Sequence, residues 1–276
     1  MKKIISIIIS VTLLLICLSG CGNSFKQGDI AIFDDAKVIY NTSSQGLKAY
    51  HSPFSFNMLN NRFVNAENDG SLPWDKTKSI VFKATAVGKP ILSTPTTDWE
   101  EFYSINYERL MLASSIITPM KIEEIYYSGE DLSMDVAVGD VVYVGLGNGT
   151  ILTEELFNYP LGAAFDQFKE KTNAAVGDLW TDFCAPYTTE MLLKENESYL
   201  LFMQETTFYY FDSEGIFSCS AHFAMYPSFC ISKEPKTAQE LGITDSREIE
   251  AYNTYYLQIR KDAIDYYVNG NKEVLS

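Results

Sequence analysis

Alternation of apolar and polar residues predicts several short strands in the middle of the chain. In residues 80–87, alternate positions are apolar on one face, and the opposite face includes Lys83 and Thr85. That period of two predicts a half-buried strand. The same reasoning predicts strands at residues 198–204 and 217–225.

Two further segments also predict strands, with less regular patterns. In residues 120–127 the apolar phase shifts between Ile122 and Ile125, which indicates a β-bulge. Residues 141–144 are apolar on both faces, as in a short buried strand. Residues 90–97, by contrast, are expected to form a loop.

Two segments have a helical period. From residue 153 to 180, apolar residues recur mostly at three- and four-residue steps, which predicts a helical insertion whose continuity Pro160 limits. Near the C-terminus, Asp245 and Glu248 resemble the capping box of a second helix, and Gly270 ends it. We expect the apolar stripe of this helix to dock on the protein's own core; it comprises Ile249, Tyr252, Tyr256, Ile259, Ala263 and Tyr267.

The first twenty residues have the pattern of an export leader. Lys2 and Lys3 precede a mostly apolar run, residues 4–18, that is short for a membrane-spanning helix. The run ends in Leu18-Ser19-Gly20-Cys21, which resembles the lipobox of bacterial lipoproteins. The resemblance implies a signal peptide at residues 1–20 and a Cys21 that becomes the N-terminus and carries a diacylglyceryl group and palmitate. An uncleaved signal anchor, or an incidental Cys21, are the alternatives.

A second resemblance covers residues 75–204. Four segments carry it, at residues 79–87, 120–129, 138–144 and 197–203. They resemble, in order, the strands of an uncharacterised OB-like domain found in surface lipoproteins of Gram-positive bacteria. The resemblance implies a small closed barrel similar to that of tissue metalloproteinase inhibitors and netrin modules. Closure into a barrel would also remove exposed strand edges.

These patterns divide the chain into four parts and predict a mainly β (α+β) fold. The signal peptide occupies residues 1–20, and a tether with a loosely structured lead-in occupies residues 21–75. An OB-like β domain with a helical insertion near 153–180 is expected at residues 76–235. The C-terminal helix, at 236–276, is expected to pack on that domain.

Charge excludes one class of partner. Lys and Arg total 21 against 36 Asp and Glu, a formal net charge of −15; loss of the leader with Lys2 and Lys3 leaves 19 basic residues and a net charge of −17. Because nucleic-acid affinity depends on clustered cations, no nucleic-acid partner is expected. The same sign disfavours adhesion to anionic lipid, so the membrane is expected to hold the protein through the lipid on Cys21.

The sequence offers little catalytic chemistry. Its two histidines, His51 and His222, lack the spacing of metal ligands, so neither a metal nor a cofactor is expected. Cys184 lies at a predicted break, where a reactive thiol and a small buried apolar side chain are the alternatives. Cys219 and Cys230 bring the cysteines after the lipobox to three, which leaves any disulfide open. No catalytic residue is assigned.

We therefore expect a non-enzymatic lipoprotein on the extracytoplasmic face of the bacterial cell membrane. It would present a binding or interaction surface to a protein or a small-molecule ligand. An extracytoplasmic enzyme remains an alternative, with Cys184 or an acidic cleft supplying the chemistry. A solute-binding lipoprotein of a transporter is another, although that class is usually longer and α/β.

Overall fold

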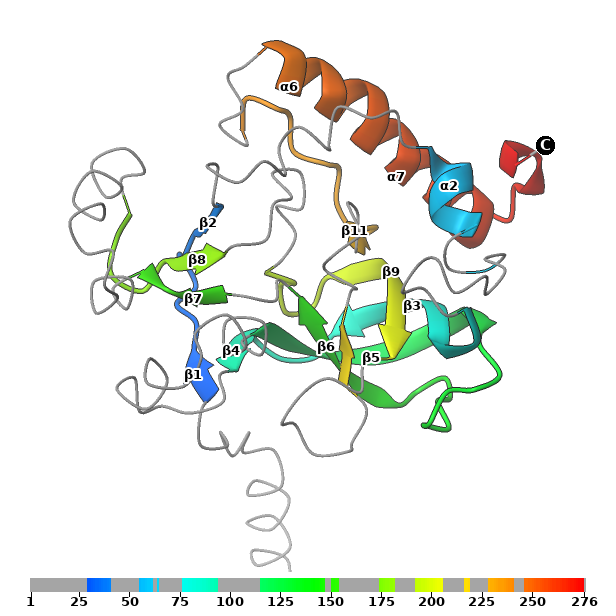
Figure 1. Cartoon of the computed structure of the whole chain (residues 1–276), viewed down its shortest axis with the longest axis horizontal. Coiled ribbons are helices and arrows are strands. Elements are labelled where there is room, and N and C mark those ends of the chain that lie inside the picture. The colour runs from blue at the N-terminus through cyan, green and yellow to red at the C-terminus, as the bar shows by residue number, and fades with distance from the viewer. Residues whose placement is uncertain are drawn as a thin grey trace, which may run out of the picture.

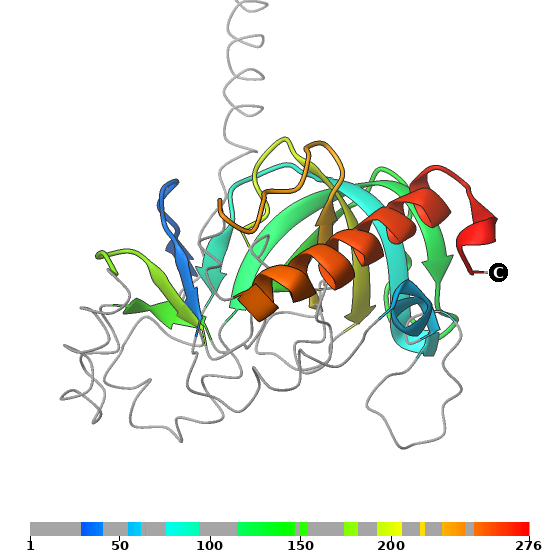
Figure 2. The same ribbon diagram turned by 90° about the horizontal axis from the view of Figure 1, so that it is seen from above.

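The architecture is mainly β. The computed structural model describes residues 29–40, 55–61, 64, 76–93, 115–146, 150–153, 174–181, 192–205, 216–218, 228–240 and 246–275. Their strands form an eight-stranded sheet and a three-stranded sheet, and a long helical segment near the C-terminus lies against the larger sheet (Figures 1 and 2). The expected fold class, mainly β with helical additions, is confirmed.

Strand β3, Ser79–Ala86, runs through the middle of the larger sheet. It pairs antiparallel with β5, Ser115–Ser128, along one edge and with β9, Ser198–Glu205, along the other. The alternation in the sequence explains its burial, because the face expected to be apolar has no exposed area at Ile80, Phe82, Ala84 and Ala86.

The β-bulge expected in β5 is confirmed. The register of β3 against β5 shifts twice, and each shift leaves one extra residue on β5, Tyr126 at the first and Glu123 at the second. The second shift lies between Ile122 and Ile125, where the apolar phase changes in the sequence. A bulge turns the following side chains to the other face, and the apolar residues that follow this one, Ile125, Tyr126 and Tyr127, are partly buried against the hydrophobic core.

Pairing continues from these three strands through two more. β6, Val141–Leu146, pairs antiparallel with β5, and β10, Ile216–Ser218, pairs antiparallel with β9. β10 also pairs in parallel with β6. Pairing can therefore be followed from β5 through β3, β9, β10 and β6 back to β5. β11, Ser228–Cys230, adds a short strand to β9.

The larger sheet is extended by two three-residue strands. β1, Asp29–Ala31, pairs with β4, Ile91–Ser93, and β4 pairs with the first residues of β5. The prediction of a loop at residues 90–97 is therefore wrong for β4. Pairing on both edges and complete burial of Leu92 stabilise this strand despite its length.

The smaller sheet joins distant parts of the sequence. β2, Val38–Tyr40, pairs in parallel with β8, Leu179–Thr181, and β8 pairs antiparallel with β7, Thr150–Leu152. The lead-in at residues 21–75 thus supplies β1 to one sheet and β2 to the other.

The helical insertion is not observed at its C-terminal end. Residues 154–173 lie outside the described part of the chain, but Leu179, which was expected to be helical, belongs to β8. Gly177 has a φ of +89°, which a right-handed helix does not accommodate, so the chain turns there. Leu179 is then buried in a small second core with Ile32, Leu92 and Ile116.

The C-terminal helical segment docks through its apolar stripe, as the sequence predicts. It consists of α6 (Ser246–Ala251), η5 (Tyr252–Tyr256), α7 (Leu257–Ala263) and η6 (Ile264–Val268). Ile249 is partly buried, and the other members of the stripe are buried. Three short helical elements complete the described structure: α2 (Phe56–Asn60), η3 (Lys76–Lys78) and η7 (Lys272–Leu275). Asp245, the expected cap, lies outside the described residues.

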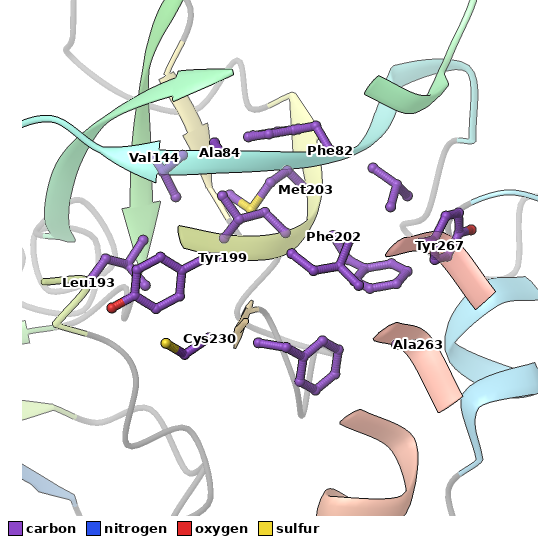
Figure 3. Close-up of a cluster of buried hydrophobic side chains, with 14 of the residues drawn as sticks. Phe82, Ala84, Val144, Leu193, Tyr199, Phe202, Met203, Cys230, Ala263 and Tyr267 are labelled. Carbon is purple, nitrogen blue, oxygen red and sulfur yellow. The ribbon is translucent and has the colours of Figure 1, made fainter. Parts of the chain in front are cut away.

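Aromatic packing fixes this helix on the sheet (Figure 3). The ring of Phe202, from β9, makes edge contacts with Phe229 of β11 and Tyr267 of η6, at centroid distances of 6.0 Å and 5.6 Å. The Tyr267 hydroxyl donates a hydrogen bond to the Asn60 side chain in α2. The main core therefore includes residues from the lead-in, the sheet and the C-terminal helix.

Candidate functional site

The structure places few of the cysteines and histidines that the sequence singles out. Cys21, the expected lipidation site, lies outside the described residues, as do Cys184, Cys219 and both histidines. Cys230 is described, and it is buried at the end of β11.

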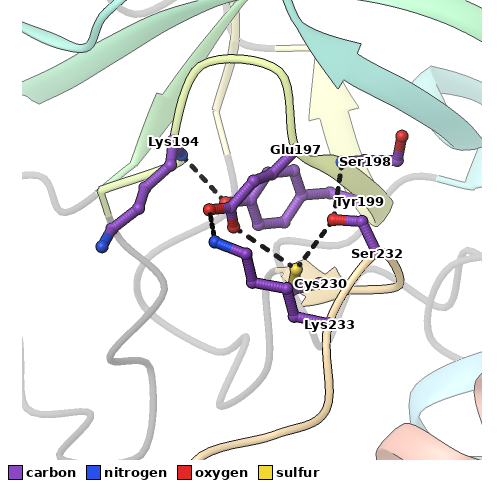
Figure 4. A network of polar contacts seen from close by, with 7 residues as sticks. All are labelled: Lys194, Glu197, Ser198, Tyr199, Cys230, Ser232 and Lys233. Atoms are coloured by element: carbon purple, nitrogen blue, oxygen red, sulfur yellow. Dashed lines mark hydrogen bonds and ion pairs between the residues drawn. The ribbon is translucent and has the colours of Figure 1, made fainter.

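Cys230 belongs to a polar cluster that joins the start of β9 to the end of β11 (Figure 4). Its thiol donates toward Glu197 Oε2 at 3.6 Å, and its Sγ lies 3.5 Å from Ser232 Oγ. Glu197 also accepts a hydrogen bond from the Tyr199 hydroxyl at 3.1 Å and forms an ion pair with Lys233. We call these five residues the Glu197 cluster.

The electrostatics of the Glu197 cluster favour a charged carboxylate. Burial raises the pKa of Glu197, but hydrogen bonds from Lys233 and Tyr199 outweigh this effect and hold its pKa below the usual range. The hydrogen bond to Glu197 in turn raises the pKa of Lys233. Cys230 is buried and donates to this carboxylate, whereas reactive cysteines are partly exposed and lie in electropositive surroundings.

The Glu197 cluster also contacts the C-terminal helix. Nη2 of Arg260, in α7, donates to the backbone carbonyls of Cys230 at 2.7 Å and Lys233 at 2.8 Å. The cluster therefore links the start of β9, the end of β11 and α7, and this geometry indicates a structural role.

A second polar group lies on the outer surface of the sheet, at the bulge of β5. Thr85 donates a hydrogen bond of 2.5 Å to Oε1 of Glu123, and Lys83 Nζ lies 2.9 Å from Oε2 of the same carboxylate. The hydrogen bonds from Thr85 and Lys83 lower the pKa of Glu123. Ser198 Oγ lies 2.6 Å from the Thr85 hydroxyl and links this group to β9. This carboxylate is also engaged within the fold.

Apolar side chains are exposed where β5 and β6 pair. Val141 is 49% exposed and Tyr143 is 41% exposed, and they pair with Lys121 and Pro119 of β5. Cross-strand partners share a face of the sheet, so these four side chains form one surface. Val87, also exposed, donates its N–H to the Pro119 carbonyl at 2.9 Å and borders that surface. We call these five residues the β5–β6 face.

Neither a metal centre nor a membrane span is found in the described part of the chain. Among those residues, no three His, Cys, Asp or Glu side chains are grouped closely enough to hold a metal ion. None of the helices within the same residues is long and apolar enough to cross a bilayer.

Comparison with known proteins adds no family. No protein-family model matches the chain, and no curated protein sequence matches it significantly.

Sequence reasoning missed both polar groups and the exposure of the β5–β6 face. The Glu197 cluster brings together residues more than thirty positions apart, from Glu197 to Lys233, so no local motif marks it. For the β5–β6 face a signal did exist, because residues 141–144 are apolar on both faces. The structure buries Val142 and Val144 and turns Val141 and Tyr143 outward.

Proposed function

We propose that the chain is an extracytoplasmic lipoprotein, anchored to the membrane, whose folded part is a non-enzymatic binding module. The leader and the lipobox ending in Cys21 support the anchor. Two or more acyl chains, with about 0.8 kcal/mol for each buried methylene, hold a protein stably on a bilayer. In this proposal Cys21 is the mature N-terminus, and β1 begins eight positions later, at Asp29.

The order of strand pairing supports an OB-like barrel as the architecture of the module. Four antiparallel pairings and one parallel pairing connect β5, β3, β9, β10 and β6 in a cycle. OB domains are five-stranded barrels that bind ligands on a face of their strands. A module of this kind presents a rigid surface, and its side chains need not carry out chemistry.

Exposure of Val141 and Tyr143 on the β5–β6 face is the observation that carries the binding function. Exposed apolar side chains on adjacent strands lose contact with water when a partner covers them, and tyrosine is enriched where interfaces are strongest. Lys121, on the same face, adds a cation to a strongly acidic molecule. This combination favours a partner that is itself a protein with an apolar surface.

Affinity capture from detergent-solubilised envelope tests this function. We expect the wild-type protein to recover a partner, and the double variant Val141→Ser, Tyr143→Ser to recover at least about tenfold less, because each side chain contributes about 1 kcal/mol or more at an interface. Val138→Ser is the matched control, since it removes a valine that is 62% exposed and belongs neither to the β5–β6 face nor to any other surface proposed to bind. Equal recovery by all three proteins, or no partner for the wild type, would contradict the proposal.

A further inference from the structure

Two adjoining turns beside the smaller sheet carry exposed apolar side chains. The first turn is closed by a hydrogen bond of 3.1 Å from the Ala36 N–H to the Phe33 carbonyl, and the second by one of 3.1 Å from the Asp178 N–H to the Ala175 carbonyl. Phe33 is 61% exposed and Val176 is 78% exposed. Turns in water usually carry polar residues or glycine, so apolar side chains at both turns require an explanation.

Partly buried hydrogen bonds hold the two turns together. The carboxylate of Asp178 accepts hydrogen bonds from the backbone N–H groups of Ala175, at 2.8 Å, and Lys37, at 2.9 Å. The Phe33 ring lies directly over Gly177, where a Cβ would come within 2.2 Å of its Cδ2 atom. The two apolar side chains are therefore presented on a rigid base. We call Phe33 and Val176 the apolar tip.

The charge beside the apolar tip is partly neutralised. Asp34 follows Phe33 directly, and Lys89 Nζ contacts both of its carboxylate oxygens, at 2.7 Å and 2.9 Å. The hydrogen bond to Asp34 raises the pKa of Lys89, which favours the charged ammonium group. Asp35 is also exposed in the same turn, so strongly anionic lipid would be repelled more than zwitterionic lipid.

The apolar tip lies close in sequence to the proposed anchor. From Cys21 to Asp29 the chain spans at most about 26–29 Å when fully extended, and Phe33 follows four residues after Asp29. A lipid on Cys21 would therefore limit how far this end of the domain can lie from the bilayer. The membrane interface accepts aromatic and aliphatic side chains that water does not favour.

We propose that the apolar tip, Phe33 and Val176, inserts into the interface of the membrane that holds Cys21 and so orients the domain. This inference rests on the lipid anchor of the proposed function. β1, β2, β7 and β8 lie on one side of the molecule, and the C-terminal η7 lies on the opposite side (Figures 1 and 2). Insertion of the tip directs the C-terminus away from the bilayer.

Fluorescence quenching by brominated lipid tests the inserted tip. The full-length lipoprotein is reconstituted into phosphatidylcholine vesicles with and without bromine on the acyl chains. Its own three tryptophans give the baseline in the wild type. We expect the added tryptophan of Phe33→Trp, and independently that of Val176→Trp, to be quenched by the brominated chains. Val138→Trp is the matched control, because Val138 is 62% exposed but follows β5 in the loop that leads to β6.

The possible outcomes distinguish failure of the proposed tip insertion from failure of the proposed lipid anchor. Mass spectrometry of the same preparation reports acylation of Cys21. An acylated protein in which neither Phe33→Trp nor Val176→Trp is quenched above Val138→Trp would overturn insertion and leave the anchor intact; it would indicate that a protein covers the tip. Absence of acyl groups on Cys21 would overturn both proposals. Quenching at the tip should be weaker when phosphatidylglycerol replaces half of the lipid, because the exposed Asp35 is repelled by anionic headgroups. Equal quenching at all three tryptophan positions would also contradict an oriented tip.

Discussion

At the residue scale, Glu197 shows how a charged side chain is accommodated near the core. Lys233 supplies an opposite charge, and Tyr199 and Cys230 supply neutral donors. A buried carboxylate is costly when it lacks partners, because the desolvation penalty remains after the compensating contacts are lost. The same carboxylate is thus a stabilising contact in the folded chain and a point of sensitivity to pH.

Glu197→Gln should destabilise the protein at neutral pH and have little effect in acid. The folded-state pKa of Glu197 is lowered, so its contribution to stability is present above the unfolded pKa of about 4.3 and is lost as the pH falls through the folded value. We expect a loss of about 1 kcal/mol in the free energy of unfolding at pH 7, the order of one typical intramolecular hydrogen bond.

Urea unfolding at pH 7, 5 and 3.5 measures this dependence. Glu130→Gln, at an exposed position in the turn after β5, is the control and should leave the midpoint almost unchanged. A Glu197→Gln variant with the same loss at every pH would show that the carboxylate's charge does not matter.

At the element scale, the sequence predicts the elements that bury one clear face. The alternation in β3, the bulge in β5 and the stripe of the C-terminal helix are all visible locally, because each reflects one surface turned toward the core. β2, β4 and β8 have three residues each and are stabilised by partners far along the chain. No periodicity over three residues distinguishes such a strand from a loop.

The polar contacts and the exposed surfaces were less predictable than the fold, because they also depend on residues far apart in the sequence. Asp178 joins two turns by accepting a hydrogen bond from the Lys37 N–H, 141 positions away in the sequence. No local sequence pattern near either residue predicts that contact. The exposure of Tyr143 depends on which face of β6 turns toward the core once the sheet has formed. Apolar composition alone therefore indicated a strand there without indicating a surface.

Gly177→Ala should destabilise the turn that carries Val176 more than Gly139→Ala destabilises its own turn. Both glycines have positive φ, +89° and +98°, so either alanine costs about 1–3 kcal/mol in backbone strain. The alanine Cβ at position 177 would in addition lie 2.2 Å from Phe33 Cδ2, whereas nothing lies within 4 Å at position 139.

A double-mutant cycle isolates this contact. In a Phe33→Ala background, the excess cost of Gly177→Ala over Gly139→Ala should disappear, because the ring that the new Cβ meets is gone. Thermal unfolding of the wild type, of Phe33→Ala and of each glycine variant in both backgrounds, about six proteins in all, measures this excess. An excess that persists without the ring would mean that Phe33 does not rest on Gly177.

At the scale of the whole molecule, charge and anchoring have to be considered together. Loss of the proposed leader would leave a net charge of −17, and an anionic membrane surface would repel a chain of that charge. In the proposed arrangement, acyl chains on Cys21 would overcome that repulsion through burial in hydrocarbon, and the apolar tip would add a second contact with the membrane. Under this proposal, the β5–β6 face would be accessible to a partner outside the cell.

Intact-mass and peptide mass spectrometry of the protein purified from its native membrane tests the anchor most directly. We expect a chain that starts at Cys21, with a diacylglyceryl thioether on its sulfur and the mass of residues 1–20 missing. A native chain that begins at Met1, or one that begins at Cys21 with an unmodified thiol, would contradict the lipid anchor.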